Sequence, residues 1–406
     1  MAITINSFGS IYNPAYNEKV IIVTSNNIAQ TNFKYIADLY IGSDVIRVTA
    51  PKHPTYNTGI FDFGRIVENY ISSDISKSTY GFQQNTNSYK SWFVKFGEEY
   101  GATPTVYPNL TTSSTFYSWN GIIDFLPFAS YVQSPYVLNA SGGNRFSTNM
   151  PTSGVIRDNE HAWLYAITDV VGGVYEARIR TYNSSGAIIQ TVKVSNPFQG
   201  LTSSNDRFIR FSTGTSNLNS IASSGITSGA QPIITASVAS YDVSFLTSLA
   251  YVITTPQFYR VDNTCTKNDT YRFHFLNALG GFDSFTFYRG SAVTSQISRS
   301  NFKSKVERQT SSTAYGYTAA SRGQTDFNIN IKDNIKVQSD WISEDVCTWL
   351  EELITSPEVY LDDATYGLVA VNILNNSYEF KQEIKEKLFN LTIDFSYSYD
   401  RTRQRK

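Results

Sequence analysis

The feature of this sequence that most constrains its fold is an alternation of apolar and polar residues with a period of two. It is clearest over 389–399, and it recurs at 33–41 and 89–100. An extended strand places every second side chain on the same face, so a half-buried strand shows this period. The sequence therefore predicts a mainly β, multi-domain protein of sandwich or barrel type with a few short helices. The apolar positions of the clearest stretch are Phe389, Leu391, Ile393, Phe395, Tyr397 and Tyr399.

Glycine-containing turns predict several hairpins. At Gly42-Ser43 the glycine comes first, which favours a type II′ turn. A four-residue loop is expected at 183–186, and Gly280-Gly281 marks a turn that needs positive φ. The strands expected beside these turns and elsewhere are 33–41, 45–48, 89–100, 161–167, 175–182, 187–194, 208–211, 233–238, 245–253, 271–275, 285–287, 358–361, 368–373 and 389–399.

Apolar residues recur at helical spacing in two places. Residues 64–71 fit one short helix. A longer amphipathic helix is expected at 343–354, where Ser343 is a favourable N-cap and Glu344 and Asp345 lie near the positive end of the helix dipole. Its apolar positions are Val346, Trp349, Leu350, Leu353 and Ile354.

A length of 406 residues is typical of two to three domains, at about 150 residues each. We expect an immunoglobulin- or fibronectin-like β-sandwich at 1–108, a β-rich domain with long polar loops at 109–260, and an α+β domain at 261–406. The stretches 139–154 and 200–231 consist mainly of Ser, Thr, Asn and Gly, which predicts loops. Long loops inside a compact domain are often functional, and contact with neighbouring subunits is one such function.

Composition excludes several function classes. With 33 basic and 34 acidic side chains the net charge is −1, so a general nucleic-acid binder is not expected. Two cysteines and three histidines are too few for a zinc or histidine-rich metal cluster. No phosphate-binding loop, zinc-protease motif or nucleophile elbow occurs. The sequence predicts a protein that is not an enzyme and has no cofactor and no metal.

Two chemical alternatives stay open. Asp362-Asp363 could bind a cation, but a turn between strands explains the pair equally well. A glycosidase needs only two carboxylates brought together in space, which a sequence does not exclude.

The first residues lack the basic segment and apolar stretch of a secretory signal. No apolar run approaches the roughly 18 residues of a membrane span. We therefore expect a chain made in the cytoplasm, without a membrane span, whose Cys265 and Cys347 stay free thiols.

Several segments resemble virion structural proteins of tailed bacteriophages of the Bacteroidetes, crAss-like phages among them. The motifs that carry the resemblance are Tyr271-Arg272-Phe273-His274-Phe275-Leu276-Asn277 with Gly280-Gly281-Phe282-Asp283, Ser339-Asp340-Trp341 with Trp349-Leu350-Glu351-Glu352-Leu353, and Tyr12-Asn13-Pro14 with Phe33-Lys34-Tyr35-Ile36-Ala37-Asp38. The resemblance implies a tail, neck or baseplate protein that forms a homo-oligomeric ring. Such a ring would contact other tail or portal-proximal proteins and surround passing DNA without binding it specifically.

Two further functions remain possible from the sequence. The first is a receptor- or carbohydrate-binding tail protein with exposed Tyr and Trp in the middle domain, because 28 Tyr accompany many Ser, Asn and Gly residues. The second is a tail-associated glycosidase. The basic C-terminus is either a solvated tail or a contact with an acidic groove on a neighbouring subunit. The residues of this candidate assembly contact are Arg401, Arg403, Arg405 and Lys406.

The sequence predicts that the histidines and cysteines have no chemical role. Single substitutions of His161, His274, Cys265 and Cys347 should therefore cost only about 0.5–3 kcal/mol of stability, as packing changes do. Thermal denaturation of the four variants measures this cost. Loss of a hydrolytic activity in a variant that keeps its fold would contradict the prediction.

Overall fold

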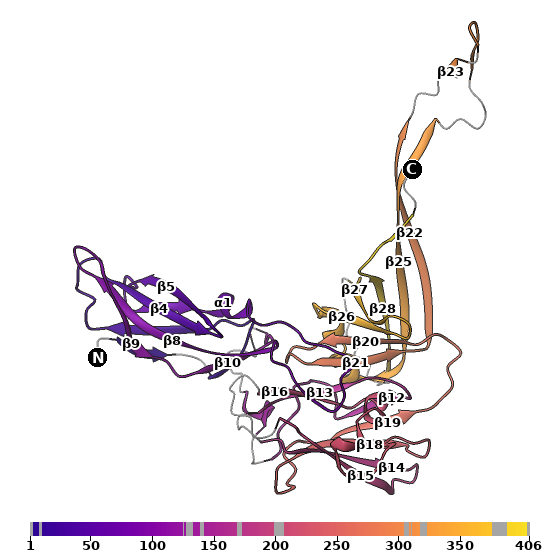
Figure 1. Cartoon of the computed structure of the whole chain (residues 1–406), viewed down its shortest axis with the longest axis horizontal. Coiled ribbons are helices and arrows are strands. Elements are labelled where there is room, and N and C mark those ends of the chain that lie inside the picture. Colours follow the sequence, from indigo (N-terminus) through magenta and orange to yellow (C-terminus); the bar gives the residue numbers. More distant parts are fainter. Residues whose placement is uncertain are drawn as a thin grey trace. The chain divides into compact units, whose positions relative to one another are not determined.

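The computed structural model describes residues 3–7, 10–124, 126, 133–138, 142–168, 173–198, 207–303, 308–309, 311–316, 323–375 and 388–403. Strands make up 52% of the chain and helices 8%, which confirms the mainly β class. The chain divides into two compact units. Figure 1 labels their helices and strands. The first comprises Met1–Thr264 and Phe275–Ser284, and the second comprises Cys265–His274 and Phe285–Lys406. The expected boundary at 260 lies close to the break after Thr264.

The first unit begins with a β-sandwich of two sheets, in the strand orders β1-β3-β6 and β2-β10-β8-β4-β5, with β9 also paired to β8. With β2 and β10 left out, β1, β3, β4, β5, β6, β8 and β9 correspond in order to strands A to G. Strands A, B and E then share one sheet and C, F and G share the other, an arrangement found in immunoglobulin-like sandwiches. The elements are β1 (Ile3–Ser7), β2 (Tyr12–Pro14), β3 (Val20–Ser25), β4 (Lys34–Ile41), β5 (Asp44–Pro51), β6 (Gly59–Asp62), α1 (Gly64–Glu68), β8 (Tyr89–Tyr100), β9 (Thr105–Thr112) and β10 (Phe116–Trp119).

The core of this sandwich lies between the two sheets, as the alternation predicts. Val23 of β3, Leu39 of β4 and Val94 of β8 are completely buried within one apolar cluster. The turn at Gly42-Ser43 has the expected form, since Gly42 has φ of 59° and Ser43 does not have positive φ. The expected boundary at 108 falls inside β9. Because β9 and β10 both pair with β8, the sandwich continues to Trp119.

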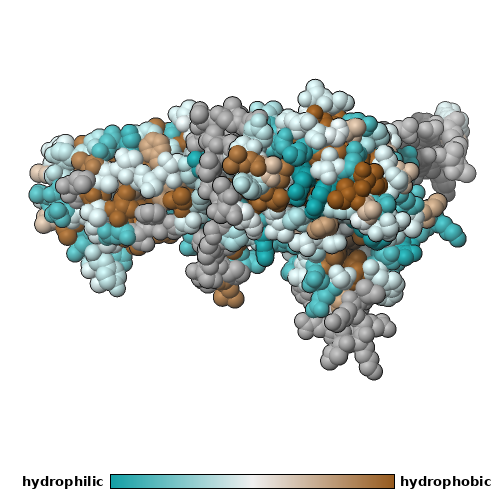
Figure 2. Space-filling view, turned by 90° about the horizontal axis from the view of Figure 1, so that it is seen from below, coloured by the Kyte–Doolittle hydropathy of each residue, from teal (hydrophilic) through white to brown (hydrophobic). Residues whose placement is uncertain are grey.

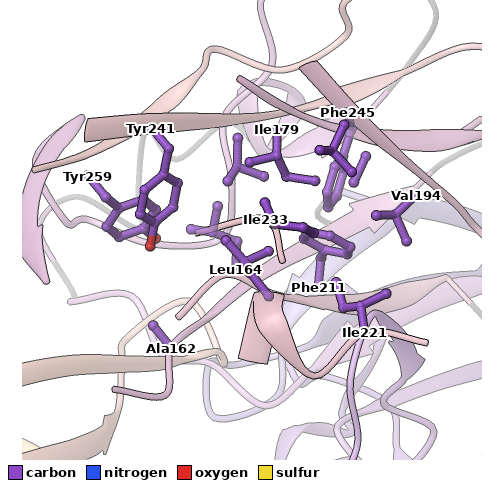
Figure 3. Close-up of a cluster of buried hydrophobic side chains, with 14 of the residues drawn as sticks. Ala162, Leu164, Ile179, Val194, Phe211, Ile221, Ile233, Tyr241, Phe245 and Tyr259 are labelled. Carbon is purple, nitrogen blue, oxygen red and sulfur yellow. The ribbon is translucent and has the colours of Figure 1, made fainter. Parts of the chain in front are cut away.

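A second sandwich follows in the first unit, with strand orders β11-β13-β16-β7 and β12-β19-β18-β14-β15-β17. Its apolar cluster is drawn in Figure 3, where Phe211 of β16 and Phe245 of β18 lie near each other from the two sheets. Its elements are β7 (Phe82–Gln84), η1 (Ser134–Tyr136), β11 (Val137–Leu138), β12 (Ser153–Arg157), β13 (Trp163–Thr168), β14 (Glu176–Tyr182), β15 (Ile188–Ser195), β16 (Phe208–Ser212), α3 (Thr215–Asn219), η2 (Ser223–Gly225), β17 (Ile226–Ser228), β18 (Ser240–Leu246) and β19 (Gln257–Asp262).

Two strands expected in this region are wrong. Residues 233–238 form no strand, although Ile233 is buried in the core. Side chains satisfy their backbone instead: the Ile234 N–H donates to Asn219 Oδ1 over 2.8 Å, and Gln190 Nε2 donates to the Ile233 carbonyl over 3.1 Å. The strand expected at 245–253 ends at Leu246, because a turn reverses the chain beyond it.

The polar stretches contain more structure than expected. The described part of 200–231 includes α3 and β17 as well as the expected strand β16, and the described part of 139–154 is mainly irregular. The remaining residues of both stretches lie outside the described residues. Within the described part, the loop at 183–186 is a hairpin turn in which Gly186 has φ of 81°.

The second unit is built on a sheet with the strand order β21-β20-β26-β27-β28-β25-β22, with β29 paired to β25. A small sheet of β23 and β24 accompanies it. Its elements are β20 (Tyr271–Leu276), β21 (Phe282–Phe287), β22 (Gly290–Lys303), β23 (Arg308–Gln309), β24 (Tyr315–Gly316), β25 (Gln324–Ser343), α4 (Glu344–Trp349), α5 (Glu351–Thr355), β26 (Val359–Asp363), β27 (Gly367–Ile373), β28 (Leu388–Tyr397) and β29 (Arg401–Thr402).

The division between the units passes through the β20–β21 hairpin, since Phe275–Ser284 belongs to the first unit. Gly280 has the expected positive φ of 85°. Gly281 is required for another reason: a Cβ there would lie 2.8 Å from the ring of Tyr165. Gly280 meets both needs, since a Cβ there would also lie 2.5 Å from the Asn120 carbonyl oxygen, whereas Gly281 meets only that of close packing.

The expected amphipathic helix is present as α4 and α5, which meet at Leu350. Ser343 occupies the N-cap position, but its side chain forms no capping hydrogen bond. Trp349, Leu350 and Leu353 are buried, and α4 contacts β28 and β25. The last strand supplies the expected apolar face through Leu391, Ile393 and Phe395, whereas Tyr399 lies beyond β28 and is exposed.

The assigned face of β28 predicts unequal costs for two aromatic substitutions. Phe395→Ala should lower the free energy of unfolding by about 3–5 kcal/mol, because it leaves a cavity beside the ring of Phe273. Tyr399→Ala should change it by at most about 0.5 kcal/mol, since Tyr399 is 80% exposed. Urea denaturation followed by circular dichroism compares them, and an equal loss in both would contradict the assignment.

Candidate assembly surface

The longest paired strands of the chain form an antiparallel ribbon in the second unit. Strand β22 has 14 residues and β25 has 20, and their register runs from Gly290 opposite Gln338 to Lys303 opposite Gln324. At about 3.4 Å per residue, the paired part extends roughly 45 Å. Figure 1 shows the ribbon as the two long strands β22 and β25. We call this pair of strands the ribbon.

The ribbon has one polar and one partly apolar face, because side chains alternate along each strand. Cross-strand pairs on the apolar face include Val293 with Ile335 and Ile297 with Ile331. The polar face carries Thr294, Gln296 and Ser298 of β22 and Asn330, Lys332, Asn334 and Lys336 of β25.

The two strands of the ribbon differ in burial. Val337 and Ile335 of β25 are 0% and 4% exposed, whereas every residue of β22 from Ser291 to Lys303 is exposed. Strand β25 has β28 or β29 on its other side over part of its length, and β22 is the edge strand of the sheet. The exposed large apolar side chains of the two strands are Val293, Ile297, Phe302, Phe327 and Trp341.

Exposed apolar residues also occur elsewhere, and in the view of Figure 2 they form separate groups among polar ones. Some of them also lie on paired strands, such as Val45 of β5 and Ile188 of β15. The ribbon differs in the length of its exposed strand, since every residue of β22 from Ser291 to Lys303 is exposed. Near its outer end, the rings of Phe302 and Phe327 lie with centroids 6.2 Å apart. A two-stranded ribbon has little core of its own, so apolar side chains at its surface indicate a binding surface.

Asp333 of β25 joins the ribbon to the C-terminal strand β29. It accepts hydrogen bonds from the Ser295 hydroxyl over 2.6 Å and from Arg401 Nη2 over 2.8 Å. Arg401 Nε also lies 2.7 Å from the second carboxylate oxygen. The hydrogen bonds from Ser295 and Arg401 hold the pKa of the Asp333 carboxyl below its usual 3.8.

Asp340 forms a second charged network at the base of the ribbon. It accepts hydrogen bonds from the Tyr288 hydroxyl, from the guanidinium of Arg289 and from the Trp341 N–H, each over 2.7–2.8 Å. Burial raises the pKa of Asp340, but these hydrogen bonds outweigh burial, so the net shift is downward. The base is therefore fixed by a carboxylate that stays charged at neutral pH.

The structure describes two of the four residues expected to form the C-terminal assembly contact. Arg401 pairs with Asp333 of its own chain, and Arg403 is exposed while its N–H donates to the Ile329 carbonyl over 3.4 Å. Arg405 and Lys406 lie outside the described residues. Contact of these cations with a neighbouring subunit stays a prediction, and Arg401 now has an intramolecular partner as well.

Two of the three histidines are buried. His274 is 0% exposed, and its Nε2 lies 3.4 Å from Asp362 Oδ2, while His161 is 9% exposed.

The Asp362-Asp363 pair lies at a turn between strands. Asp363 accepts hydrogen bonds from the backbone N–H groups of Thr365 and Tyr366, as expected if the pair serves the turn. Across the part of the chain that the structure describes, no three His, Cys, Asp or Glu side chains gather as metal ligands would. Cys265 and Cys347 form no disulfide with each other.

The tryptophans of the middle region do not form the recognition surface of the receptor-binding alternative. Trp119 and Trp163 are 0% and 2% exposed, whereas that alternative needs exposed tryptophans at 109–260. Tyr251 is exposed, at 67%. Both tryptophans lie in strands whose apolar faces are covered, which explains their burial.

The ribbon is the candidate surface that the sequence did not predict. Its edge strand has only two large apolar residues before its outer end, Val293 and Ile297, separated by Ser295, so the period of two is hard to recognise. The other strand carried a usable signal, since Ile329, Ile331, Ile335 and Val337 all have odd positions. That row is interrupted at Asp333, which the structure shows to be held by Ser295 and Arg401.

Comparisons with known proteins do not assign the chain to a family. No protein-family model and no curated protein matches it. Among solved structures, dimeric latent PorU from Porphyromonas gingivalis is similar over 83% of this chain, at 8% sequence identity and a TM-score of 0.17. The chain spans 32% of the length of that structure. A TM-score this low carries no argument about fold or function.

No helix within the described ranges is long and apolar enough to cross a membrane.

The Asp333–Arg401 pair predicts a pH-dependent contribution to stability. Asp333→Asn should lower the free energy of unfolding by about 0.2–1 kcal/mol at pH 7, as for other partly exposed ion pairs. Because the folded pKa is below the unfolded one, this stabilisation is complete above the unfolded pKa and is lost as pH falls through the folded pKa. The difference in melting temperature between wild type and variant should therefore shrink once the pH falls below 3.8 and vanish in stronger acid.

The matched control for this pair is Arg403→Gln, which removes a nearby exposed cation. It should leave the melting temperature unchanged at both pH values. An effect of Asp333→Asn that is the same at pH 7 and in acid would contradict the role of the charge.

Proposed function

We propose that this protein is a structural component of a tailed bacteriophage virion that assembles through contacts between copies and with other tail proteins. The ring in the tail, neck or baseplate that the resemblance implies is the form we propose for this assembly. The single observation that supports assembly best is the ribbon, which exposes apolar side chains along two strands that extend beyond the rest of their sheet.

The energetics of the ribbon support an assembly role. Val293, Ile297 and Phe302 are 61%, 45% and 48% exposed. Burying such side chains stabilises by roughly 1.5–3 kcal/mol each, a gain that the isolated chain does not obtain in full. A partner that covers the ribbon would obtain the remainder, which favours a binding role for these strands.

The charge balance is compatible with a ring around a DNA conduit. A net charge of −1 over 406 residues gives no general attraction for phosphates. Several cations are also paired within the chain, as Arg289 is with Asp340 and Arg401 is with Asp333. Such a wall would let DNA pass without holding it.

The alternative of receptor or carbohydrate binding rests on exposed tyrosines of the middle region, such as Tyr251 and Tyr175. Electron microscopy of the purified particle, with this chain located in it, separates the two functions. A position at the portal-proximal collar or in another ring of the tail supports the assembly role. A position in a peripheral fibre supports receptor binding and would overturn the ring.

Shortening the ribbon should block assembly without unfolding the chain. Ser298 and Asn330 are opposite each other, so an Asn-Gly turn can replace 299–329. The shortened chain should keep its melting temperature, because the described residues of the removed segment are mainly exposed, but should be absent from purified particles. Mass spectrometry of particles grown with the variant measures its incorporation.

The control for this variant shortens another exposed hairpin, at 183–186, to the same two-residue turn. It should enter particles normally. Normal incorporation of the ribbon variant would contradict the role that we propose for the ribbon.

A further inference from the structure

Strand β22 presents a long sheet edge that no other strand of the described residues covers. Natural edge strands are usually protected from further pairing by prolines, inward charges, bulges or short length. From Gly290 to Ser298 this strand has no proline and no charged residue. Its pairing with β25 stays regular up to Ser300, where the register shifts. The edge therefore lacks the usual protection over Gly290–Ser298.

Hydrogen bonds in the interior of the sheet indicate which way the backbone groups of β28 point. The Leu374 N–H donates to the Asp394 carbonyl over 2.7 Å, and the Ser398 N–H donates to the Ala370 carbonyl over 3.1 Å. Even-numbered residues of β28 therefore point their backbone groups toward β27. Successive residues of a strand alternate in this direction. The odd-numbered residues of β28, such as Phe395, thus point toward β25.

The same alternation carries through β25 to β22. Ile335 faces Phe395 of β28, so odd-numbered residues of β25 point their backbone groups toward β28. The Arg403 N–H, which donates to the Ile329 carbonyl, agrees with this direction. Even-numbered residues of β25 then bond to even-numbered residues of β22. The odd-numbered residues of β22, Ser291 to Arg299, are left with N–H and C=O groups that point to the open edge.

We propose that this edge pairs with the same edge of a second copy of this chain, antiparallel, with Ser295 opposite Ser295 of the second copy. Odd-numbered residues then face odd-numbered residues, so the outward backbone groups of both strands meet. Val293 faces Ile297 of the second copy, and Ile297 faces Val293. Sliding one copy by two residues would instead place Val293 and Ile297 opposite serine or arginine.

The apolar side chains of both copies form continuous rows in this register. Within one copy, Val293 lies opposite Ile335 and Ile297 lies opposite Ile331. Across the dimer each row thus contains four apolar residues on one face, in the order Ile335, Val293, Ile297 and Ile331, the last two from the second copy. Cross-strand apolar pairs of this kind add to the hydrogen bonds between the strands in holding a sheet together.

The charges of the edge are compatible with self-pairing. Arg299 is the only charged residue between Gly290 and Ser300. In the proposed register it faces Ser291 of the second copy, so no like charges meet. Arg299 also has Asp326 of its own chain 3.6 Å away. A second copy therefore fits the edge in hydrogen-bond direction, apolar pairing and charge.

This contact differs from the one that would repeat around a ring. A twofold contact is complete after two copies, whereas a ring needs a contact that continues from copy to copy. An experiment can therefore contradict the proposed dimer without contradicting the proposed ring, and the reverse also holds.

Cross-linking tests the register directly. In a Cys265→Ser background, Ser295→Cys places two thiols opposite each other, at a Cα–Cα distance of about 5.5 Å in a hydrogen-bonded antiparallel pair. Oxidation or a short bifunctional maleimide should join the full-length chains into a covalent dimer. Ser291→Cys is the matched control, equally exposed on the same strand and face. Its two thiols would be about 27 Å apart, at about 3.4 Å per residue along the strand.

We expect at least tenfold more covalent dimer from Ser295→Cys than from Ser291→Cys at micromolar concentration. Equal yields from the two variants, or no dimer from Ser295→Cys when its thiol is shown to be reactive, would overturn the proposal.

A charge-pair experiment tests it a second way. Val293→Lys and Ile297→Glu should each weaken self-association roughly tenfold, measured by sedimentation, because each places a charge against an apolar side chain twice per dimer. When the two variants are mixed, the introduced lysine would face the introduced glutamate, and the unchanged Ile297 would face the unchanged Val293, so the dimer should return. A mixture no more dimeric than its components, with both variants folded, would overturn the register.

Discussion

The second unit depends on strand β25, which is an interior strand at one end and part of an exposed ribbon at the other. Over Asn334–Ser343 it pairs with β28, and as far as Gln338 it also pairs with β22; in the doubly paired part Val337 is completely buried. Toward its other end it has β29 at Asn330 and Ile331, and farther out only β22 among the described strands. A two-stranded ribbon is marginal in water by itself, so its order comes from the sheet at its base. The unit thus carries an extended arm without a separate core for it.

The sequence predicted the strands whose two faces have different surroundings. Strand β8 spans Tyr89–Tyr100, as expected from the alternation, and β28 follows the final alternating stretch. These strands have one face on a core and one face near water, which imposes the period of two. The prediction of a strand at 233–238 was wrong because side chains, and not a neighbouring strand, form hydrogen bonds with its backbone. Its residues include several apolar and β-branched ones, but Asn219 and Gln190 satisfy their backbone in an irregular conformation.

The candidate surface was less predictable than the fold, because exposure on both faces removes the sequence signal. Strand β22 has no buried residue between Ser291 and Lys303, so nothing selects apolar residues at every second position. The basic C-terminus was visible as a cluster of charge. Its partner Asp333 was not, because only the pairing of β25 with β29 brings it beside Arg401. The periodicity of a single sequence does not show which distant segments pair with each other.

A chain that exposes an unprotected edge must avoid pairing with unrelated strands before it reaches its partner. The ribbon meets this need on its polar face, where Gln296, Lys332 and Lys336 keep one side of the edge hydrated. A foreign strand would have to match both the outward backbone groups and the spacing of Val293 and Ile297. The second copy meets both conditions because it has the same strand. Apolar pairing on one face and hydration on the other thus favour a specific partner over general aggregation.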